Sequence, residues 1–154
     1  MGAYAEKAVQ LFREGYNCSQ SVFGAFAGRY GIDRDTAMRL ASSFGAGMGR
    51  LREVCGTVSA MCLIAGLESG STDGADQAQK AANYIEVQEL VTRFKEKYHT
   101  ICCADLLHLD KTREESTNPV PEARTQAYYK NRPCPDIIRC AAELIEERYC
   151  PDDV

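Results

Sequence analysis

A glycine-rich turn that leads into an uncharged apolar segment constrains the fold more than any other part of the chain. The stretch from Phe44 to Leu67 reads FGAGMGRLREVCGTVSAMCLIAGL and has three glycines in five residues, at positions 45, 47 and 49. Glycine tolerates a positive φ and a close backbone approach, so we expect a tight loop here. No charged side chain occurs between Val54 and Leu67, and the segment is shorter than the about 20 apolar residues that cross a bilayer. We therefore predict a buried central helix that carries Cys55 on its first turn, held against the loop.

The length and charge of the chain limit its function classes. A chain of 154 residues suits one domain with a single core. The formal net charge is −4, and the lysines and arginines are scattered, so no basic stripe could neutralise phosphates. The N-terminal stretch lacks the apolar core of a signal peptide, and Gly2 lacks the Ser or Thr at position 6 that myristoylation needs. We expect a cytoplasmic protein that neither binds nucleic acid nor inserts into a membrane.

The spacing of apolar residues predicts helices and no strands. The expected helices span residues 3–13, 17–27, 34–43, 54–67, 75–99 and 101–109, and a last one opens at Cys134. Residues 110–133 are the least regular part and are expected to be loop, with room for one helical turn. The prediction is an all-α single domain over residues 1–154, a helical bundle of five to seven helices.

Eight cysteines are the outstanding feature of the composition. The cytosol keeps thiols reduced, so metal binding or redox chemistry gains weight over structural disulfides. A free cysteine can also serve as a small buried hydrophobe. The place of each cysteine in the predicted helices must therefore distinguish a site residue from a packing residue.

Four cysteines fall at or within one turn of a predicted helix N-terminus, where unsatisfied amides and the helix dipole favour a thiolate. These four are Cys18, Cys55, Cys134 and either Cys103 or Cys102. We predict that the helix N-termini converge on a site made by these residues. Cys62 and Cys140 lie within helix bodies and Cys150 lies near the end of the chain, so packing accounts for them.

Other functional motifs are weak or absent. The loop GAGMGR follows a helical pattern and lacks the third glycine of a dinucleotide-binding fingerprint, and no P-loop or Cys-x-x-Cys-His haem motif occurs. His99 and His108 flank the cysteine pair, so a mixed zinc site stays open, although solvated surface histidines are the simpler interpretation. Arg50 and Arg52 could pair with thiolates or an anionic partner, but a surface salt bridge is the simpler interpretation here too.

The sequence resembles the C-GCAxxG-C-C family of small redox-active proteins, which have four characteristic cysteines. The matching stretches are YNCSQSV at Cys18, the stretch from Phe44 to Leu67 at Cys55, CADLL at Cys103 and CPDIIRCAAELIEE at Cys134. In the central motif Cys55 and Gly56 are kept, while Thr57 replaces Ala and Ala60 replaces the final Gly, both small-for-small changes. The resemblance favours Cys103 over Cys102. The family's cysteine region is also similar to part of split-Soret cytochromes, which implies an iron–sulfur site.

The leading prediction is a redox protein with an iron–sulfur or other metal centre used in electron transfer with a partner protein. Its predicted ligands are Cys18, Cys55, Cys103 and Cys134. One alternative is a thiol–disulfide oxidoreductase that uses the same cysteines. The other is a zinc-stabilised, non-enzymatic binding module. Whether the chain is an enzyme, the identity of its redox partner and homo-oligomerisation stay open.

Overall fold

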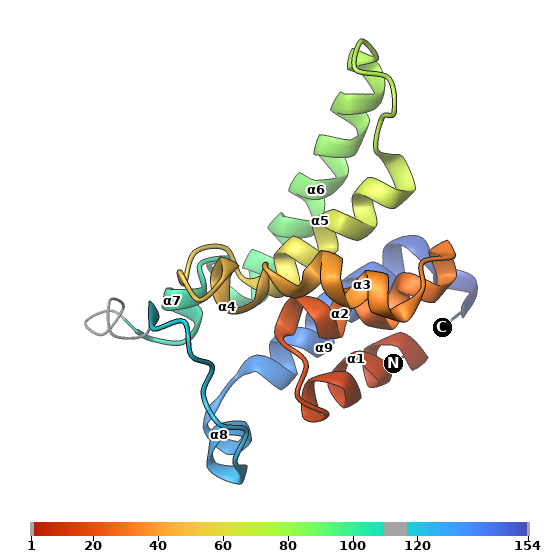
Figure 1. Cartoon of the computed structure of the whole chain (residues 1–154). Helices are drawn as coiled ribbons and strands as arrows, with labels where there is room; N and C mark the ends of the chain where they lie inside the picture. The colour runs from red at the N-terminus through yellow and green to blue at the C-terminus, as the bar shows by residue number, and fades with distance from the viewer. Residues whose placement is uncertain (1, 110–116, 154) are drawn as a thin grey trace.

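The structure, a computed structural model, describes residues 2–109 and 117–153, and these form an assembly of α-helices (Figure 1). The six long helices are α1 (Ala3–Arg13), α2 (Cys18–Phe26), α3 (Arg34–Ser42), α5 (Gly56–Ser69), α6 (Gln77–Tyr98) and α9 (Cys134–Tyr149). The shorter elements are α4 (Gly45–Met48), α7 (Cys103–Leu106), α8 (Gln126–Asn131) and the 3-10 turns η1 (Ala27–Tyr30) and η3 (Pro151–Asp153). The described residues form no strand, only one isolated antiparallel bridge between Val54 and Cys102. The all-α prediction is confirmed, and the short helices bring the number of helices slightly above five to seven.

Helix α2 lies at the centre of the fold and packs against α1, α3, α5 and α9. Large apolar side chains from these helices meet there, each 2% exposed or less: Phe12, Phe23, Phe26, Ile64, Ile138 and Ile145. Burying one such side chain contributes about 1.5–3 kcal/mol to stability. The core therefore fixes the relative positions of the helices whose N-termini carry cysteines.

The bounds of the helices follow local signals in the sequence. Helix α2 begins after a capping box, in which the Asn17 side chain accepts from the Gln20 N–H and the Gln20 side chain accepts from the Asn17 N–H. Asp33 caps α3 in the predicted place. Helix α7 is shorter than the predicted 101–109, because Cys102 before it is extended and bridges to Val54, and the chain takes a positive φ at His108 after it. Of the predicted loop 110–133, residues 110–116 lie outside the described residues, and α8 supplies the short helical segment.

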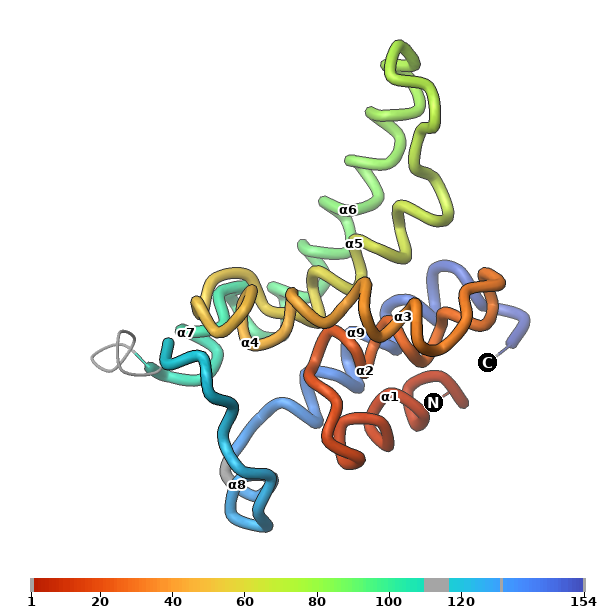
Figure 2. The backbone as a smooth tube through the Cα atoms, viewed as in Figure 1, coloured from red at the N-terminus to blue at the C-terminus, as the bar shows by residue number. Residues whose placement is uncertain are grey.

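Helix α5 is central but only half buried, so the prediction of a buried helix is wrong for its outer face. Its inner face, which includes Val58, Met61 and Ile64, is buried. On the outer face, Cys62 is exposed and Leu67 is 45% exposed. Helices α5 and α6 form a hairpin whose tip extends away from the other helices (Figure 2).

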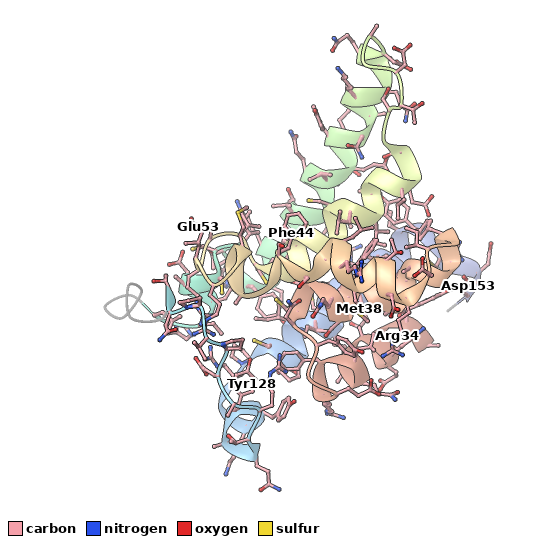
Figure 3. All side chains as sticks on the ribbon, viewed as in Figure 1. Arg34, Met38, Phe44, Glu53, Tyr128 and Asp153 are labelled. Carbon is pink, nitrogen blue, oxygen red and sulfur yellow. The ribbon has the colours of Figure 1, made fainter. Side chains whose placement is uncertain are left out.

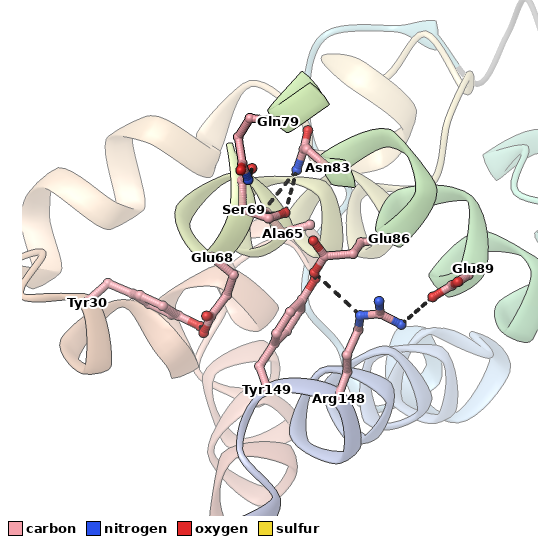
Figure 4. A network of polar contacts seen from close by, with 10 residues as sticks. All are labelled: Tyr30, Ala65, Glu68, Ser69, Gln79, Asn83, Glu86, Glu89, Arg148 and Tyr149. Carbon is pink, nitrogen blue, oxygen red and sulfur yellow. Dashed lines mark hydrogen bonds and ion pairs between the residues drawn. The ribbon is translucent and has the colours of Figure 1, made fainter. Parts of the chain in front are cut away.

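Polar contacts join the hairpin to α9 (Figure 4). The Tyr149 hydroxyl donates to Glu86 at 2.8 Å, and Arg148 lies 2.6 Å from Glu89. Within the hairpin, Asn83 donates to the Ala65 carbonyl at 3.2 Å. These contacts hold α6 in place beside α9, which carries Cys134 on its first residue.

Among the residues that the structure describes, no helix is both long and apolar enough to cross a membrane.

Candidate functional site

Four helix N-termini place one cysteine each around the same cavity. Cys18 is the first residue of α2, Cys103 of α7 and Cys134 of α9, and Cys55 is the N-cap residue of α5. All four line a cavity of about 300 Å³, which is at the lower end of the range for small-molecule sites. The structure thus brings together the four cysteines that the sequence selects, from positions up to 116 residues apart in the chain.

Gly56 allows the N-termini of α2 and α5 to touch. A Cβ atom at this position would lie 2.5 Å from the Cys18 Sγ and 2.9 Å from the Phe44 carbonyl oxygen. Both distances are shorter than van der Waals contact, so any side chain here must displace Cys18 or the backbone. The glycine that follows Cys55 therefore allows the Cys18 sulfur to lie against the first residue of α5.

A short antiparallel bridge joins the segments of Cys55 and Cys103. The Cys55 N–H donates to the Ile101 carbonyl at 2.7 Å, and the Cys103 N–H donates to the Glu53 carbonyl at 2.6 Å. The bridge between Val54 and Cys102 lies between these two hydrogen bonds. Two cysteines that are far apart in the sequence are thus positioned by backbone hydrogen bonds.

The predicted glycine loop is wound in the left-handed sense, and Figure 3 shows it between the labelled Phe44 and Glu53. Five consecutive residues, 46–50, have φ between 55° and 72°. For a non-glycine residue this conformation costs about 1–2 kcal/mol. The Glu53 N–H donates to the Gly47 carbonyl at 2.8 Å, and a Cβ at Gly47 would lie 2.6 Å from the Arg52 Cα. The loop therefore closes tightly on the backbone of Arg52.

Arg52 lies inside the molecule, next to a cavity cysteine. Its side chain is 3% exposed, and its Nη1 lies 3.8 Å from the Cys103 Sγ. Its Nη2 lies 4.0 Å from Glu122. The interpretation of Arg52 as a surface salt-bridge residue is wrong, because the left-handed loop and the bridge to Cys103 carry it inward.

The irregular segment before α9 supplies the outer wall of the cavity. Its lining residues are Pro121, Glu122, Arg124, Tyr128 and Arg132. Arg132 contacts both carboxylate oxygens of Glu122 at 2.5 Å. Tyr128 lies on α8 (Figure 3). None of these residues could be predicted from the sequence, since they lie in the least periodic part of the chain and no motif marks them.

Arg124 attaches this wall to α1. Its guanidinium donates to the Phe12 and Tyr16 carbonyls, both at 3.0 Å, and lies 4.5 Å from the centre of the Phe12 ring. Lysine cannot make both hydrogen bonds in this fork geometry.

We expect Arg124→Lys to lower the free energy of unfolding by about 1–2 kcal/mol and to speed amide hydrogen exchange in residues 121–132. Lys130→Ala, at an exposed position of the same segment, is the control. Equal exchange in the two variants would contradict this role of Arg124.

Burial raises the pKa of three of the four thiols. The pKa of Cys55 and of Cys103 is raised, and that of Cys134 is raised to about 12; desolvation is the largest cause in each case. At Cys103 the neighbouring Arg52 opposes this effect. For Cys55, Cys103 and Cys134 the expectation that a helix N-terminus favours the thiolate is therefore wrong for the metal-free protein. A bound cation would be needed to drive off their protons near pH 7.

The remaining cysteines lie outside the described lining of the cavity. Cys102 is the N-cap residue of α7, and its Sγ lies 3.4 Å from the Arg52 carbonyl. Cys140 and Cys150 are buried in the core, as packing residues would be, whereas Cys62 is exposed. All eight cysteines are free thiols.

The two histidines are exposed and do not belong to the described cavity lining either. His99 and His108 both have a positive φ, at turns that follow α6 and α7. This placement agrees with solvated surface histidines.

The donor types that line the cavity limit the kind of group that it could hold. Within residues 2–109 and 117–153, no three Cys, His, Asp or Glu side chains are grouped so that they could hold one metal ion. A two- or four-iron cluster also takes four cysteine thiolates, but it distributes them over several irons. Four thiols around a cavity of about 300 Å³ fit a cluster in donor type and in room.

The comparisons with known proteins gave one match. A family model described as "Putative redox-active protein (C_GCAxxG_C_C)" matches residues 16–148. Neither the curated proteins nor the solved structures gave a match. The matched range contains the four cavity cysteines, together with Gly56 and the left-handed loop. The chain belongs to the C_GCAxxG_C_C family of redox-active proteins.

Proposed function

We propose that the protein transfers electrons through an iron–sulfur cluster held by Cys18, Cys55, Cys103 and Cys134. One observation carries the proposal: four thiols from four helix N-termini line one cavity of about 300 Å³. Four cysteine thiolates are the usual ligand set of two- and four-iron clusters. The redox-active family of the chain agrees with this use of the cysteines.

The residues of the cavity would bind the cluster and shield it. A bound cluster supplies one-electron chemistry. Apolar side chains of Phe12, Leu106 and Ile137 line part of the cavity and would limit the access of water. Because burial raises the pKa of most of these thiols, cluster assembly would release their protons and be favoured by higher pH.

The two alternative functions receive less support from the structure. A zinc-stabilised module needs three or four donors around one ion, and the described residues contain no such group. Thiol–disulfide exchange needs a thiolate, and burial raises the pKa of Cys55 and Cys134. Both alternatives remain outcomes of the test below.

Anaerobic purification followed by an absorption spectrum and metal analysis tests the proposal. We expect visible charge-transfer absorption together with bound iron and acid-labile sulfide. A colourless protein with one zinc per chain would contradict the cluster and support the binding module. A metal-free protein whose thiols form defined disulfides would contradict the cluster and support thiol exchange.

A further inference from the structure

We propose that Arg52 is a positioning residue of this site: its guanidinium donates to the Cys103 sulfur and thereby raises the reduction potential of the centre. The effect on the potential rests on the proposed function, whereas the contact with the sulfur does not. Arg52 is separated from Cys103 by 51 positions in the chain. The contact is therefore a product of the fold.

The contact is buried and charge-assisted. The Nη1 atom lies 3.8 Å from the Cys103 Sγ, within hydrogen-bond range for sulfur, and the arginine side chain is 3% exposed. A guanidinium keeps its charge at any pH at which the protein is folded. With little water nearby, its attraction to the negative charge of a centre bound at this sulfur is screened much less than at the surface.

The backbone around Arg52 is held from both sides. Its N–H donates to the Ala46 carbonyl at 3.3 Å, and its carbonyl accepts from the Ala104 N–H at 3.2 Å. Ala104 follows Cys103 directly, so the arginine backbone is hydrogen-bonded to the segment that carries the sulfur. This placement does not depend on the other partners of the guanidinium.

The conformation of Arg52 carries a backbone cost that supports a functional role. Its φ is 62°, in the left-handed region, although it is not a glycine. Such outliers cost about 1–3 kcal/mol and persist only where the surroundings enforce them, often at functional sites. Here the conformation directs a buried cation toward a sulfur.

Glu122 approaches the other edge of the guanidinium. Its Oε1 lies 4.0 Å from the Arg52 Nη2, and Arg132 holds the same carboxylate by two contacts of 2.5 Å. The carboxylate is 43% exposed, so solvent screens it more than the buried sulfur. Solvent therefore weakens the pull of Glu122 on the guanidinium.

The direction of the effect on the potential follows from charge. Each reduction adds one negative charge to a centre that already has four thiolate ligands. A fixed cation and an N–H···S hydrogen bond stabilise the more negative, reduced state more strongly, and hydrogen bonds to the sulfurs are a recognised determinant of cluster potentials. Removing Arg52 should therefore lower the potential.

The first test compares the midpoint potentials of Arg52→Gln, Arg52→Lys and Arg39→Gln. We expect Arg52→Gln to shift the one-electron equilibrium about tenfold toward the oxidised state, which corresponds to a fall in the midpoint potential of about 59 mV. Arg52→Lys should restore part of this shift. Arg39 is exposed on α3, so Arg39→Gln removes one charge away from the site. A potential of Arg52→Gln equal to that of Arg39→Gln, at equal iron content, would overturn the proposal.

The second test uses the metal-free, reduced protein and does not require a cluster. Alkylation of Cys103, measured by peptide mass spectrometry relative to Cys134, should slow severalfold in Arg52→Gln, because only the thiolate form reacts and Arg52 opposes the rise that burial causes in the pKa of Cys103. Arg52→Lys should recover part of the rate. If the wild type holds no cluster and the rate still falls, the proposed function fails while the Arg52–Cys103 pairing is supported. An unchanged rate ratio would overturn the pairing itself.

Discussion

A Gly56→Ala variant is expected to lose about 2–3 kcal/mol of stability and to fail to hold the centre. The added Cβ would lie 2.5 Å from the Cys18 Sγ and 2.9 Å from the backbone oxygen of Phe44. Overpacking of this kind costs about 1–3 kcal/mol, and the backbone atom cannot move away as a flexible side chain could. The displaced Cys18 would no longer be placed with Cys55.

Gly66→Ala is the matched control, because it makes the same change in the same helix. No atom lies within 4 Å of a Cβ at Gly66, so the variant should gain about 0.5–1 kcal/mol from helix propensity. Urea unfolding of both proteins measures the difference. If Gly56→Ala proved as stable as Gly66→Ala, the close contact between α2 and α5 would be wrong.

The metal-free, reduced protein is expected to lose about 3 kcal/mol of stability between pH 8 and pH 9.5. Burial raises the pKa of Cys55, Cys103 and Cys134 in the folded state, whereas an unfolded cysteine titrates near about 8.5. Above that pH the folded state binds more protons than the unfolded state, so the free energy of unfolding falls as the pH rises. The stabilisation is complete below the unfolded pKa and is lost as the pH rises through the folded pKa.

Urea unfolding at a series of pH values measures this dependence. Cys55→Ala should make the slope shallower by about 1.4 kcal/mol per pH unit, the contribution of one thiol. Cys140 and Cys150 are also buried with a raised pKa, and they add to the slope in the same direction. A stability that stays constant from pH 8 to pH 9.5 would contradict the burial of the cavity thiols as neutral groups.

The helices and the approximate cysteine positions could be predicted because local signals determine them. Asn17 and Gln20 form the expected capping box, which places Cys18 on the first turn of α2. Pro135 falls in the first turn of α9, where its missing N–H costs nothing, so Cys134 begins that helix. The prediction that Cys103, not Cys102, takes part in the centre stays a prediction, although Cys103 is the one that lines the cavity.

The parts of the site that could not be predicted depend on long-range backbone contacts. The hydrogen bonds between Cys55 and Ile101 and between Cys103 and Glu53 join segments with no periodic pattern in common. The same pairing turns Arg52 inward. The raised pKa of Cys55 and Cys134 follows from burial, which depends on the packing of the whole fold. Periodicity reveals none of these features.

The central claim is that the four cavity cysteines hold an iron–sulfur cluster, and the iron and sulfide content of anaerobically prepared single variants tests it most directly. Cys18→Ser, Cys55→Ser, Cys103→Ser and Cys134→Ser should lose most of the bound iron and sulfide, since each lacks one ligand. Cys102→Ser, Cys62→Ala and Cys150→Ala should keep wild-type amounts. Wild-type protein without iron and sulfide, or a Cys102→Ser variant that is empty while Cys103→Ser stays loaded, would contradict the account.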